Sequence, residues 1–567
     1  MRRQKNRPEA AADYDYSDRE SRERTVQELF ARAKNARTAR ELEWTRYNDY
    51  YNGIHDATSE IIAYCRENDL PWTPANMPDP WILVESQMDP TVPEPEFRGR
   101  DADLDSEKAR EREFAVRYIA ENNRLKDMNT RNERRLLKLG DAFWKAYWDP
   151  AMRCGVREGD IRLKDIPVDA IFPDPSVRDG TIQDGQYLCY VYRIHKVLFG
   201  QMFCRELAEL GISQEDLLSR DYVERAGLFD LSTAVDDTDD TIQVLEHWFR
   251  QPTDTRGLHG EIVPAGAVGC SIQAGGRELR YIPNYWERTG EQNKLFPFVH
   301  YRRIQDENQI WNKSELFPIL DLVDAADRKL AMGLLNDAFM ANDILLVEEG
   351  ALADGAEVTN EPGAVLKLRP NAMGRVQRLG GLQSIGGAAQ GVDFFKEQIE
   401  RTARNYETAQ GKEASMVTSA TGLALLRSDA QTQAEIKRQD RNAGFERLYE
   451  LLDWLALEFF DDDRMLFLGA DPSRGRPARS MRFNADDLSE ERQEGRRYWP
   501  RIDVTVTASD SVIRSKAATC QALQALSSSN VTAENWRLFA AQLEVLDIPG
   551  KQEIIDDWRR RFEMPRL

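Results

Sequence analysis

The sequence predicts a mixed α+β fold that is mainly α-helical and contains several packed regions. Length is the first observation, because 567 residues exceed what a single hydrophobic core usually serves. Periodicity is the second, because apolar residues recur at helical spacing in long segments, whereas short alternating segments lie between about residues 141 and 283. Composition is the third: 41% hydrophobic and 31% charged residues suit a helical chain with a large polar surface.

Charge and composition exclude several classes of protein. The net charge of −20 argues against a free-standing nucleic-acid binder, but not against a protein that DNA only slides past. The six cysteines are scattered without a CxxC pair, so we expect reduced, mostly buried thiols. The five histidines form no HExxH-like pair, so no metal site and no cofactor is expected. The polar start lacks a secretory signal, and no run approaches the ~18 apolar residues of a membrane helix, so no membrane partner is expected.

The N-terminal part is predicted to be helical after a polar arm, residues 1–24, whose first twenty residues look disordered. A long helix is expected from about Glu20 to Tyr51, ended by Asn52-Gly53. A second helical region is expected over about Ser106–Leu139. The first helix shows mostly three- and four-residue spacing of apolar positions, which predicts a buried stripe of Val26, Leu29, Phe30, Ala33, Ala36 and Leu42.

A small mixed β region is expected next, with a helical insert over about Lys196–Leu217. The turn Trp148-Asp149-Pro150 is expected to close its first strand. The predicted strands are Asp141–Tyr147, Asp160–Leu163, Tyr187–Ile194, Thr241–Arg250, Ala267–Gln273 and Arg280–Pro283.

The centre of the chain predicts a helix, a β-like insert and a second helix. The first helix, Lys313–Asn342, has Ser314 as a plausible N-cap and would span ~45 Å. The insert, Ile344–Gly387, contains strand pieces at 344–347 and 365–368. Ala388–Gln410 is helical again. The apolar stripe of the first helix is expected to be Leu316, Ile319, Leu320, Val323, Leu330 and Leu334.

A break containing Gly and Ser, Gly411–Gly422, separates this pair from the longest predicted helix, Leu423–Phe460. That helix keeps a near-heptad stripe and is closed by Asp461-Asp462-Asp463. A strand is expected at Ile502–Thr507, and a helical C-terminus from about Val512 to Met564. The stripe of the longest helix comprises Phe445, Leu448, Leu452, Leu455 and Phe459.

Five loose motifs occur in an order that resembles the tailed-bacteriophage portal (head-to-tail connector) protein family. The resemblance covers about Glu41 to Arg537, around the helix–insert–helix centre. The motifs are the helix ending Tyr50–Gly53, the strand-like Gly140–Asp149 (GDAFWKAYWD), the segment Asp165–Pro175 (DIPVDAIFPDP), the strand Phe296–Val299 (FPFV), and the strand Arg501–Val506 (RIDVTV).

The resemblance implies a portal fold with wing, stem, clip and crown, assembled as a ring of usually twelve subunits. It implies a channel for DNA packaging and ejection at one capsid vertex, with assembly in the host cytoplasm. The implied partners are further copies of this chain, the large terminase, a head–tail adaptor protein, the major capsid protein, a scaffolding protein and weakly held double-stranded DNA. The implied regions are the wing at 25–311 and 463–511, stem helices at 312–342 and 388–410, the clip at 343–387, the tunnel loop at 411–422, a long helix at 423–462 and the crown at 512–567.

The resemblance also assigns residues to these parts. An acidic subunit with isolated basic side chains would let a polyanion pass without trapping it. The stem residues expected to face the channel are Lys396, Arg401 and Arg404. The tunnel-loop residues are Lys412, Glu413, Ser415, Met416 and Thr418, with a simple helix–helix connector as the alternative. The clip residues expected to dock partners are Glu348, Glu349, Arg369, Asn371 and Arg375.

Two other functions remain open on the sequence. A metal-dependent hydrolase or nuclease could use the acidic clusters Asp236–Asp240 and Asp461–Asp463, although adjacent aspartates usually mark solvated loops or helix ends. A helical scaffold or adaptor without a channel is the second alternative. No Walker A pattern and no nucleophile motif is present, so no enzymatic activity is expected.

Overall fold

The structure is a computed structural model that divides into two compact units. Unit 1 comprises Met1–Trp44, Met88–Lys313 and Glu435–Leu567, and unit 2 comprises Thr45–Gln87 and Ser314–Ala434. The structure describes residues 14–67, 75–89, 91–99, 105–154, 157–178, 180–214, 217, 240–257, 260–341, 344–353, 367–379, 387–403, 420–470, 477–491, 497–506, 536–537, 539–540, 558 and 561.

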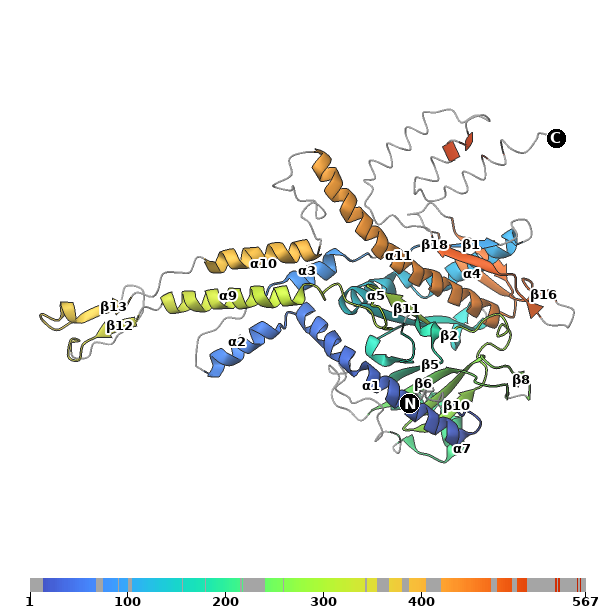
Figure 1. The fold of residues 1–567 in the computed structure, drawn as a ribbon. Helices are drawn as coiled ribbons and strands as arrows, with labels where there is room; N and C mark the ends of the chain where they lie inside the picture. Colours follow the sequence, from blue (N-terminus) through green and yellow to red (C-terminus); the bar gives the residue numbers. More distant parts are fainter. Residues whose placement is uncertain are drawn as a thin grey trace, which may run out of the picture. The chain divides into compact units, whose positions relative to one another are not determined.

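The chain mixes helix and strand and is 45% helical, so the predicted mixed fold is confirmed (Figure 1). Its α-helices are α1 (Arg19–Tyr51), α2 (Asp56–Glu67), α3 (Asp79–Ser86), α4 (Ser106–Asn122), α5 (Leu125–Leu139), α6 (Lys196–Met202), α7 (Cys204–Leu210), α9 (Leu320–Ala341), α10 (Gly387–Ala403) and α11 (Ala420–Phe459). Its 3₁₀ turns are η1 (Val168–Ala170), η2 (Ile182–Asp184) and η4 (Met373–Arg375).

The strands form one five-stranded sheet, one three-stranded sheet and five two-stranded pairs among the described residues. They are β1 (Pro95–Gly99), β2 (Asp141–Cys154), β3 (Arg157–Ile166), β4 (Ile171–Pro173), β5 (Tyr187–His195), β6 (Thr241–Arg250), β7 (Thr255–Arg256), β8 (Ile262–Val263), β9 (Val268–Ala274), β10 (Arg277–Ile282), β11 (Phe298–Arg302), β12 (Ile344–Val347), β13 (Val376–Leu379), β14 (Arg464–Leu468), β15 (Arg479–Phe483), β16 (Glu490–Glu491), β17 (Arg497–Tyr498) and β18 (Ile502–Val506).

The five-stranded sheet of unit 1 has the antiparallel order β10-β9-β6-β5-β4. One face is covered by the start of α1, whose residues Val26, Leu29 and Phe30 pack with Phe172 and Phe249. The other face is covered by α6 and α7 through Phe199, Phe203 and Leu207. Because both faces are covered, β6 is buried almost throughout, including its polar residues Gln243, Glu246 and His247.

The predicted stripe of α1 is correct in its first half and wrong in its second. Ala36 and Leu42 are exposed, and the buried positions continue instead through Arg37, Arg40 and Trp44. Arg37 is buried because its guanidinium donates to the backbone carbonyls of Asp169 and Ile171, at 2.7 and 2.6 Å, and pairs with Glu41. A stripe judged by apolar residues alone misses arginines that lie on the buried side.

The three-stranded sheet of unit 1 has the order β11-β2-β3. The predicted turn at residues 148–150 is wrong, because β2 continues to Cys154. The ladder with β3 shifts register between Asp149 and Arg153, and this irregularity accommodates Pro150, which has no N–H to donate. Between the two sheets, the Lys145 ammonium lies 2.7 Å from a carboxylate oxygen of Glu246, and both side chains are buried.

The helical region predicted at Ser106–Leu139 is two helices. They are separated at Asn123-Arg124, where Arg124 has a left-handed backbone with φ of 52°. Gly140 ends α5 with φ of 88°, and a Cβ there would lie 2.4 Å from the carbonyl oxygen of Asn312.

The part of α11 in unit 1 is buried as the near-heptad stripe predicts. Phe445, Leu448, Leu452 and Leu455 are fully buried, and Phe459 is half-buried. Buried ion pairs tie this helix to its surroundings: Arg441 Nε lies 2.6 Å from Glu133, and Arg112 Nε lies 2.8 Å from Asp453.

The C-terminal strand is confirmed as β18, which pairs with β1. The helical prediction for 512–564 lies outside the described residues except for 536–537, 539–540, 558 and 561, which are helical. None of the described helices has both the length and the apolar character of a membrane span.

Candidate channel segment and docking hairpin

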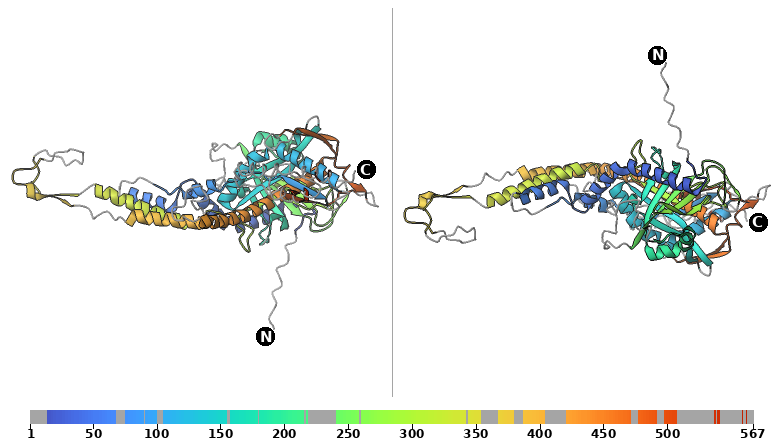
Figure 2. Two further views of the ribbon diagram at one scale, coloured as in Figure 1. Left: turned by 90° about the horizontal axis from the view of Figure 1, so that it is seen from above. Right: turned by 90° about the horizontal axis from the view of Figure 1, so that it is seen from below.

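In unit 2, α9 and α10 run side by side and pack against each other, and the strand pair β12–β13 lies between them in the chain (Figures 1 and 2). Helices α2 and α3 also pack on α9. The predicted order of helix, β insert and helix is therefore present. The insert lies at one end of the helix pair in both figures.

The first of these helices begins later than the sequence predicts. The prediction started it at Lys313 with Ser314 as N-cap, whereas α9 begins at Leu320. Pro318 explains the difference, because a proline disfavours helical backbone at the residue before it, here Phe317. Ser314 is buried and its hydroxyl accepts the backbone N–H of Leu316 at 3.0 Å, so it caps a turn upstream of the helix.

The predicted apolar stripe is buried in its first half. Leu316 and Ile319 in the turn before α9 are buried, as are Leu320 and Val323 within the helix. Leu330 is half-buried and the Leu334 side chain is 40% exposed, so the predicted stripe weakens along the helix.

Aspartates on the inner side of α9 were not singled out by the sequence reasoning. Asp327 is fully buried and accepts two hydrogen bonds: from His55 Nδ1 at 2.5 Å and from the backbone N–H of Met77 at 2.7 Å. His55 is itself buried and stacks on Tyr50. The available signal was the spacing of Asp324 and Asp327, which places these carboxylates beside an apolar stripe, where burial requires that they have partners.

A second polar group surrounds Arg46 at the end of α1. Its guanidinium lies 3.0 Å from Asp324, 3.1 Å from Asp321 and 3.3 Å from Asp56. Burial lowers the pKa of Arg46, but the hydrogen bonds to Tyr50 and Asp321 outweigh it and raise that pKa above the usual value. Burial and a hydrogen bond to Asp324 raise the pKa of Tyr50. These pairs fasten α1 and α2 to α9 within unit 2.

Two of the three basic residues expected on the second stem helix lie in α10, and both are exposed. Arg401 lies 2.5 Å from Glu397 one turn away, so its charge is locally compensated. Lys396 acts on Asp79 of α3: burial raises the pKa of Asp79, and the charge of Lys396 partly offsets that rise. Arg404 lies outside the described residues.

The two helices carry more negative than positive charge. Helix α9 contains four aspartates against one arginine and one lysine. Helix α10 contains three carboxylates against one lysine and one arginine. Neither helix therefore carries the excess of basic side chains that releases counterions from a polyanion.

The predicted tunnel loop, 411–422, is only partly within the described residues. Its candidate residues Lys412, Glu413, Ser415, Met416 and Thr418 all lie outside them. The last three residues of the predicted loop belong to α11, which begins at Ala420 rather than at Leu423.

The docking candidates lie in and beside the strand pair β12–β13, and all five are exposed: Glu348, Glu349, Arg369, Asn371 and Arg375. Glu348 and Arg375 face each other across the end of the pair, with a backbone hydrogen bond of 3.0 Å and a side-chain distance of 3.5 Å. Asn371 has a left-handed backbone with φ of 64°, which forms a tight turn near Arg369.

The predicted strand piece at 344–347 is β12, and it pairs with Val376–Leu379. Of the second predicted piece, 365–368, only Lys367 and Leu368 are within the described residues. Leu368 forms only an isolated bridge with Leu352. Two apolar runs were available to pair with β12, and the pattern of hydrophobic residues does not distinguish them.

Three aspartates of the two acidic clusters have basic partners. Asp462 lies 2.8 Å from Arg464, and Asp463 lies 2.7 Å from Arg482. Asp240 pairs with Lys196, whereas residues 236–239 lie outside the described part. No group of three potential metal ligands occurs among the described residues.

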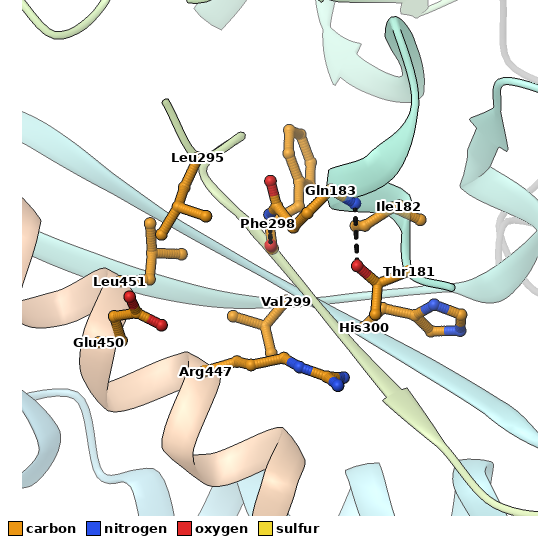
Figure 3. Close-up of a pocket in the computed structure, with 10 residues that line it drawn as sticks. All are labelled: Thr181, Ile182, Gln183, Leu295, Phe298, Val299, His300, Arg447, Glu450 and Leu451. Atoms are coloured by element: carbon orange, nitrogen blue, oxygen red, sulfur yellow. Dashed lines mark hydrogen bonds between the residues drawn. The ribbon is translucent and has the colours of Figure 1, made fainter. Parts of the chain in front are cut away.

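A small cavity lies in unit 1 between η2, β11 and α11 (Figure 3). Its volume is about 30 Å³, enough for one or two water molecules and far below the several hundred Å³ of a ligand site. The Gln183 side chain crosses it and donates to the carbonyl oxygens of Phe296 and Phe298, at 2.9 and 2.7 Å. A cavity of this volume is too small to be an active-site cleft.

The geometry alone does not identify the family of this chain, so we compared the sequence with known proteins and family models. A search among curated proteins finds no match. The family model of the phage P22-like portal protein matches residues 30–566, nearly the whole chain. The match includes the helix pair, the hairpin and α11 together with the sheets of unit 1. The chain therefore belongs to the phage P22-like portal protein family, a family of head–tail connectors that serve DNA packaging in bacteriophages.

Proposed function

We propose that this chain is the subunit of a portal ring, a twelve-membered channel at one capsid vertex through which DNA is packaged and ejected. The observation that carries the proposal is the pair α9–α10, with the hairpin β12–β13 between its helices, in a chain that matches the portal family over nearly its whole length. Long helices give a conduit length and stiffness, because their backbone hydrogen bonds are internal.

In this proposal the regions keep the bounds expected from the sequence. Residues 25–311 and 463–511 form the wing, 312–342 and 388–410 the stem, 343–387 the clip, 411–422 the tunnel loop and 512–567 the crown. The charge of α9 and α10 supports a stem along which DNA slides, because acidic residues outnumber basic ones on both helices. DNA contact is then weak, sensitive to salt and independent of sequence.

The clip is proposed to dock the large terminase during packaging and the head–tail adaptor afterwards. Support comes from the exposure of its five candidate residues, which present both signs of charge on a short strand pair. The wing and crown are proposed to contact the capsid and scaffolding proteins. The proposed location is the portal vertex of the virion, after assembly in the host cytoplasm.

Negative-stain microscopy of the purified chain tests this function. Rings of about twelve subunits with a central hole are the expected result. Monomers that cleave DNA only when a divalent metal is added would favour the hydrolase alternative, and elongated oligomers without a hole would favour a scaffold.

A binding measurement on the same rings tests the sliding surface. We expect duplex DNA to bind far more weakly than the roughly 10⁻⁸ M or tighter of specific complexes at physiological salt. Binding as tight as that of a specific complex would overturn this part of the proposal.

A further inference from the structure

Helix α6 presents an apolar side to solvent, here called the α6 patch: Val197, Leu198 and Met202. Their side chains are 56%, 51% and 50% exposed. Leu198 and Met202 lie one helical turn apart and Val197 precedes Leu198, so the three occupy one side of this short helix. No other helix or strand among the described residues exposes three large apolar side chains. A contiguous group of this kind, unlike a single exposed leucine, indicates a docking surface.

The described chain stops beside α6. The Gln214 side chain lies against Gly200 of α6, where a Cβ would overlap its amide nitrogen. Leu217 is buried in the same hydrophobic cluster as Phe199 of α6. Residues 218–239 then lie outside the described residues. The residues that precede this stretch are therefore held at α6.

The described chain resumes beside the same helix. The carbonyl oxygen of Asp240 accepts the backbone N–H of Lys196, the first residue of α6, at 2.7 Å. The Asp240 carboxylate also pairs with the Lys196 ammonium, and Ile242 joins the cluster that contains Phe199. Both ends of the stretch 218–239 are thus fixed at a helix about 10 Å long. The stretch is long enough to cross that helix and return, because an extended chain spans up to ~3.3 Å per residue.

The sequence of this stretch complements the α6 patch. The run Leu228–Leu231 (LFDL) carries three large apolar side chains. Contact between this run and the α6 patch would remove apolar surface of both from water. The stretch 218–239 also contains six carboxylates against two arginines, whereas Arg205 is exposed at the start of α7, next to α6. Charge and apolar content therefore favour the same contact.

We propose that the run Leu228–Leu231 docks on the α6 patch of its own chain. The chain's own run is favoured over that of a neighbouring copy, because both ends of the stretch 218–239 are bound at α6. The proposal does not depend on ring formation. Its consequence is that the side of the five-stranded sheet covered by α6 and α7 is closed within each subunit and is not a docking face for a partner protein.

Methionine oxidation of the purified full-length chain tests the contact. Dilute hydrogen peroxide converts accessible methionine to the sulfoxide, and Met465 on β14, 64% exposed, is a reference within the same chain. Met202 is expected to oxidise at least about fivefold more slowly than Met465, because the docked run excludes the reagent. Peptide mass spectrometry gives both rates from one sample. Equal rates for the two methionines would overturn the proposal.

Removal of the run identifies what covers Met202. In the variant Phe229→Asp/Leu231→Asp, the oxidation rate of Met202 should rise to that of Met465. The control Ser219→Asp/Thr238→Asp adds the same charge at the two ends of the stretch and should leave Met202 protected. Circular dichroism checks that each variant is folded. Unchanged protection in the folded first variant would assign the α6 patch to a different occupant and exclude the run.

A mixture of two chains separates the chain's own run from that of a neighbour. One chain carries Phe229→Asp/Leu231→Asp and keeps Met202, and the other carries Met202→Leu with an intact run. In rings assembled from equal amounts of both, Met202 should remain fully reactive. Protection of Met202 in these rings would show that the run docks on the next subunit, against the proposal. If the unmodified chain formed no ring, the proposed function would fail, while the oxidation of Met202 in the single chain would still decide this contact.

Discussion

The imidazole Nδ1 of His55 lies 2.5 Å from a carboxylate oxygen of Asp327, and both side chains are buried. The other oxygen of Asp327 accepts the backbone N–H of Met77. One aspartate in α9 therefore holds the residue that precedes α2 and the segment that precedes α3. The candidate stem helix is fastened to its neighbours by this polar contact as well as by its apolar stripe.

Replacing Asp327 by alanine is expected to lower the free energy of unfolding by roughly 3 kcal/mol, because removal of one partner leaves buried polar groups unmatched. Chemical denaturation measures the change, and hydrogen exchange in α2 and α9 locates it. The control Arg328→Ala removes an exposed ion pair with Glu60, 3.2 Å apart, and should cost less than about 1 kcal/mol. Equal effects of the two changes would show that the buried contact is not specially important.

Acid sensitivity is expected from His247 in the five-stranded sheet. Its Nε2 atom is hydrogen-bonded to the Tyr16 hydroxyl at 3.0 Å, and its Nδ1 atom is hydrogen-bonded to the Cys189 sulfur at 3.2 Å. Burial lowers the pKa of His247 to about 3. Because the folded pKa is below the unfolded value, the unfolded chain binds the extra proton between about pH 6.5 and pH 3. The contribution of neutral His247 to the free energy of unfolding is therefore fully present above pH 6.5. It decreases as the pH falls through this window, by roughly 4 kcal/mol at the lower end.

The variant His247→Gln removes this titration while keeping a polar side chain. Its unfolding free energy should depend less on pH between 7 and 4 than that of the unmodified chain. His195→Gln, at an exposed histidine, is the matched control. An unchanged slope in His247→Gln would contradict the assignment.

Gly444 in α11 is expected to tolerate no side chain. A Cβ there would lie 2.3 Å from Cδ1 of Tyr301, whose ring is fully buried. Gly444→Ala should therefore lower the unfolding free energy by about 1–3 kcal/mol despite the better helix propensity of alanine. Gly391→Ala on α10 is the contrasting change, because its Cβ would lie 3.7 Å from Lys329 Cδ and should stabilise by up to about 1 kcal/mol. Thermal unfolding of the two variants compares them directly, and stabilisation by both would exclude the clash.

The clip proposal predicts a loss of docking without a loss of assembly. Glu349 and Arg369 are exposed beside the strand pair, so the variant Glu349→Lys/Arg369→Glu should leave rings intact. Affinity for the purified terminase or adaptor is expected to fall roughly tenfold, because contact charges across an interface are reversed. Surface plasmon resonance on immobilised rings measures it, with Glu60→Lys on α2 as a control. Undiminished binding of both partners would exclude these two residues from the docking surface.

Basic residues on α10 are expected to matter little for DNA. Arg401 is already paired with Glu397, and Lys396 acts on Asp79. Salt dependence is measured as the slope of log binding constant against log salt concentration, and two free phosphate contacts would contribute roughly two units to it. The variant Lys396→Gln/Arg401→Gln should change this slope by less than that amount. A decrease of about two units in the slope, measured by fluorescence anisotropy, would assign both residues to direct phosphate contact.

Elements with an unambiguous pattern could be predicted closely from the sequence. The bounds of β6 and β12 agree with the prediction, because each strand is a short segment with strand-like patterning. The end of α1 at Tyr51 also agrees, because Asn52-Gly53 ends the helix. The start of α9 could not be placed by periodicity, because the pattern continues through Pro318 while the backbone before a proline does not remain helical. The partner of β12 depends on tertiary pairing, which no local pattern encodes.

The candidate site was predicted in its order of elements but not in its polar contacts. Exposure of Glu348, Lys396 and Arg401 agrees with a surface role, whereas the roles assigned to them stay predictions. The buried contact of His55 with Asp327 joins residues 272 positions apart, so its partner could not be found by spacing. An aspartate beside an apolar stripe indicates that a partner exists, without indicating which residue it is.

The arginine at position 37 has consequences for how this family can diverge. Its guanidinium binds the main-chain oxygens of residues 169 and 171, which every amino acid provides. This contact therefore places no constraint on the side chains at positions 169 and 171, whereas it does require an arginine at position 37. Across related phages, position 37 should remain constant opposite a variable segment, and methods that infer contacts from correlated substitutions should overlook this polar link between α1 and the segment 169–171.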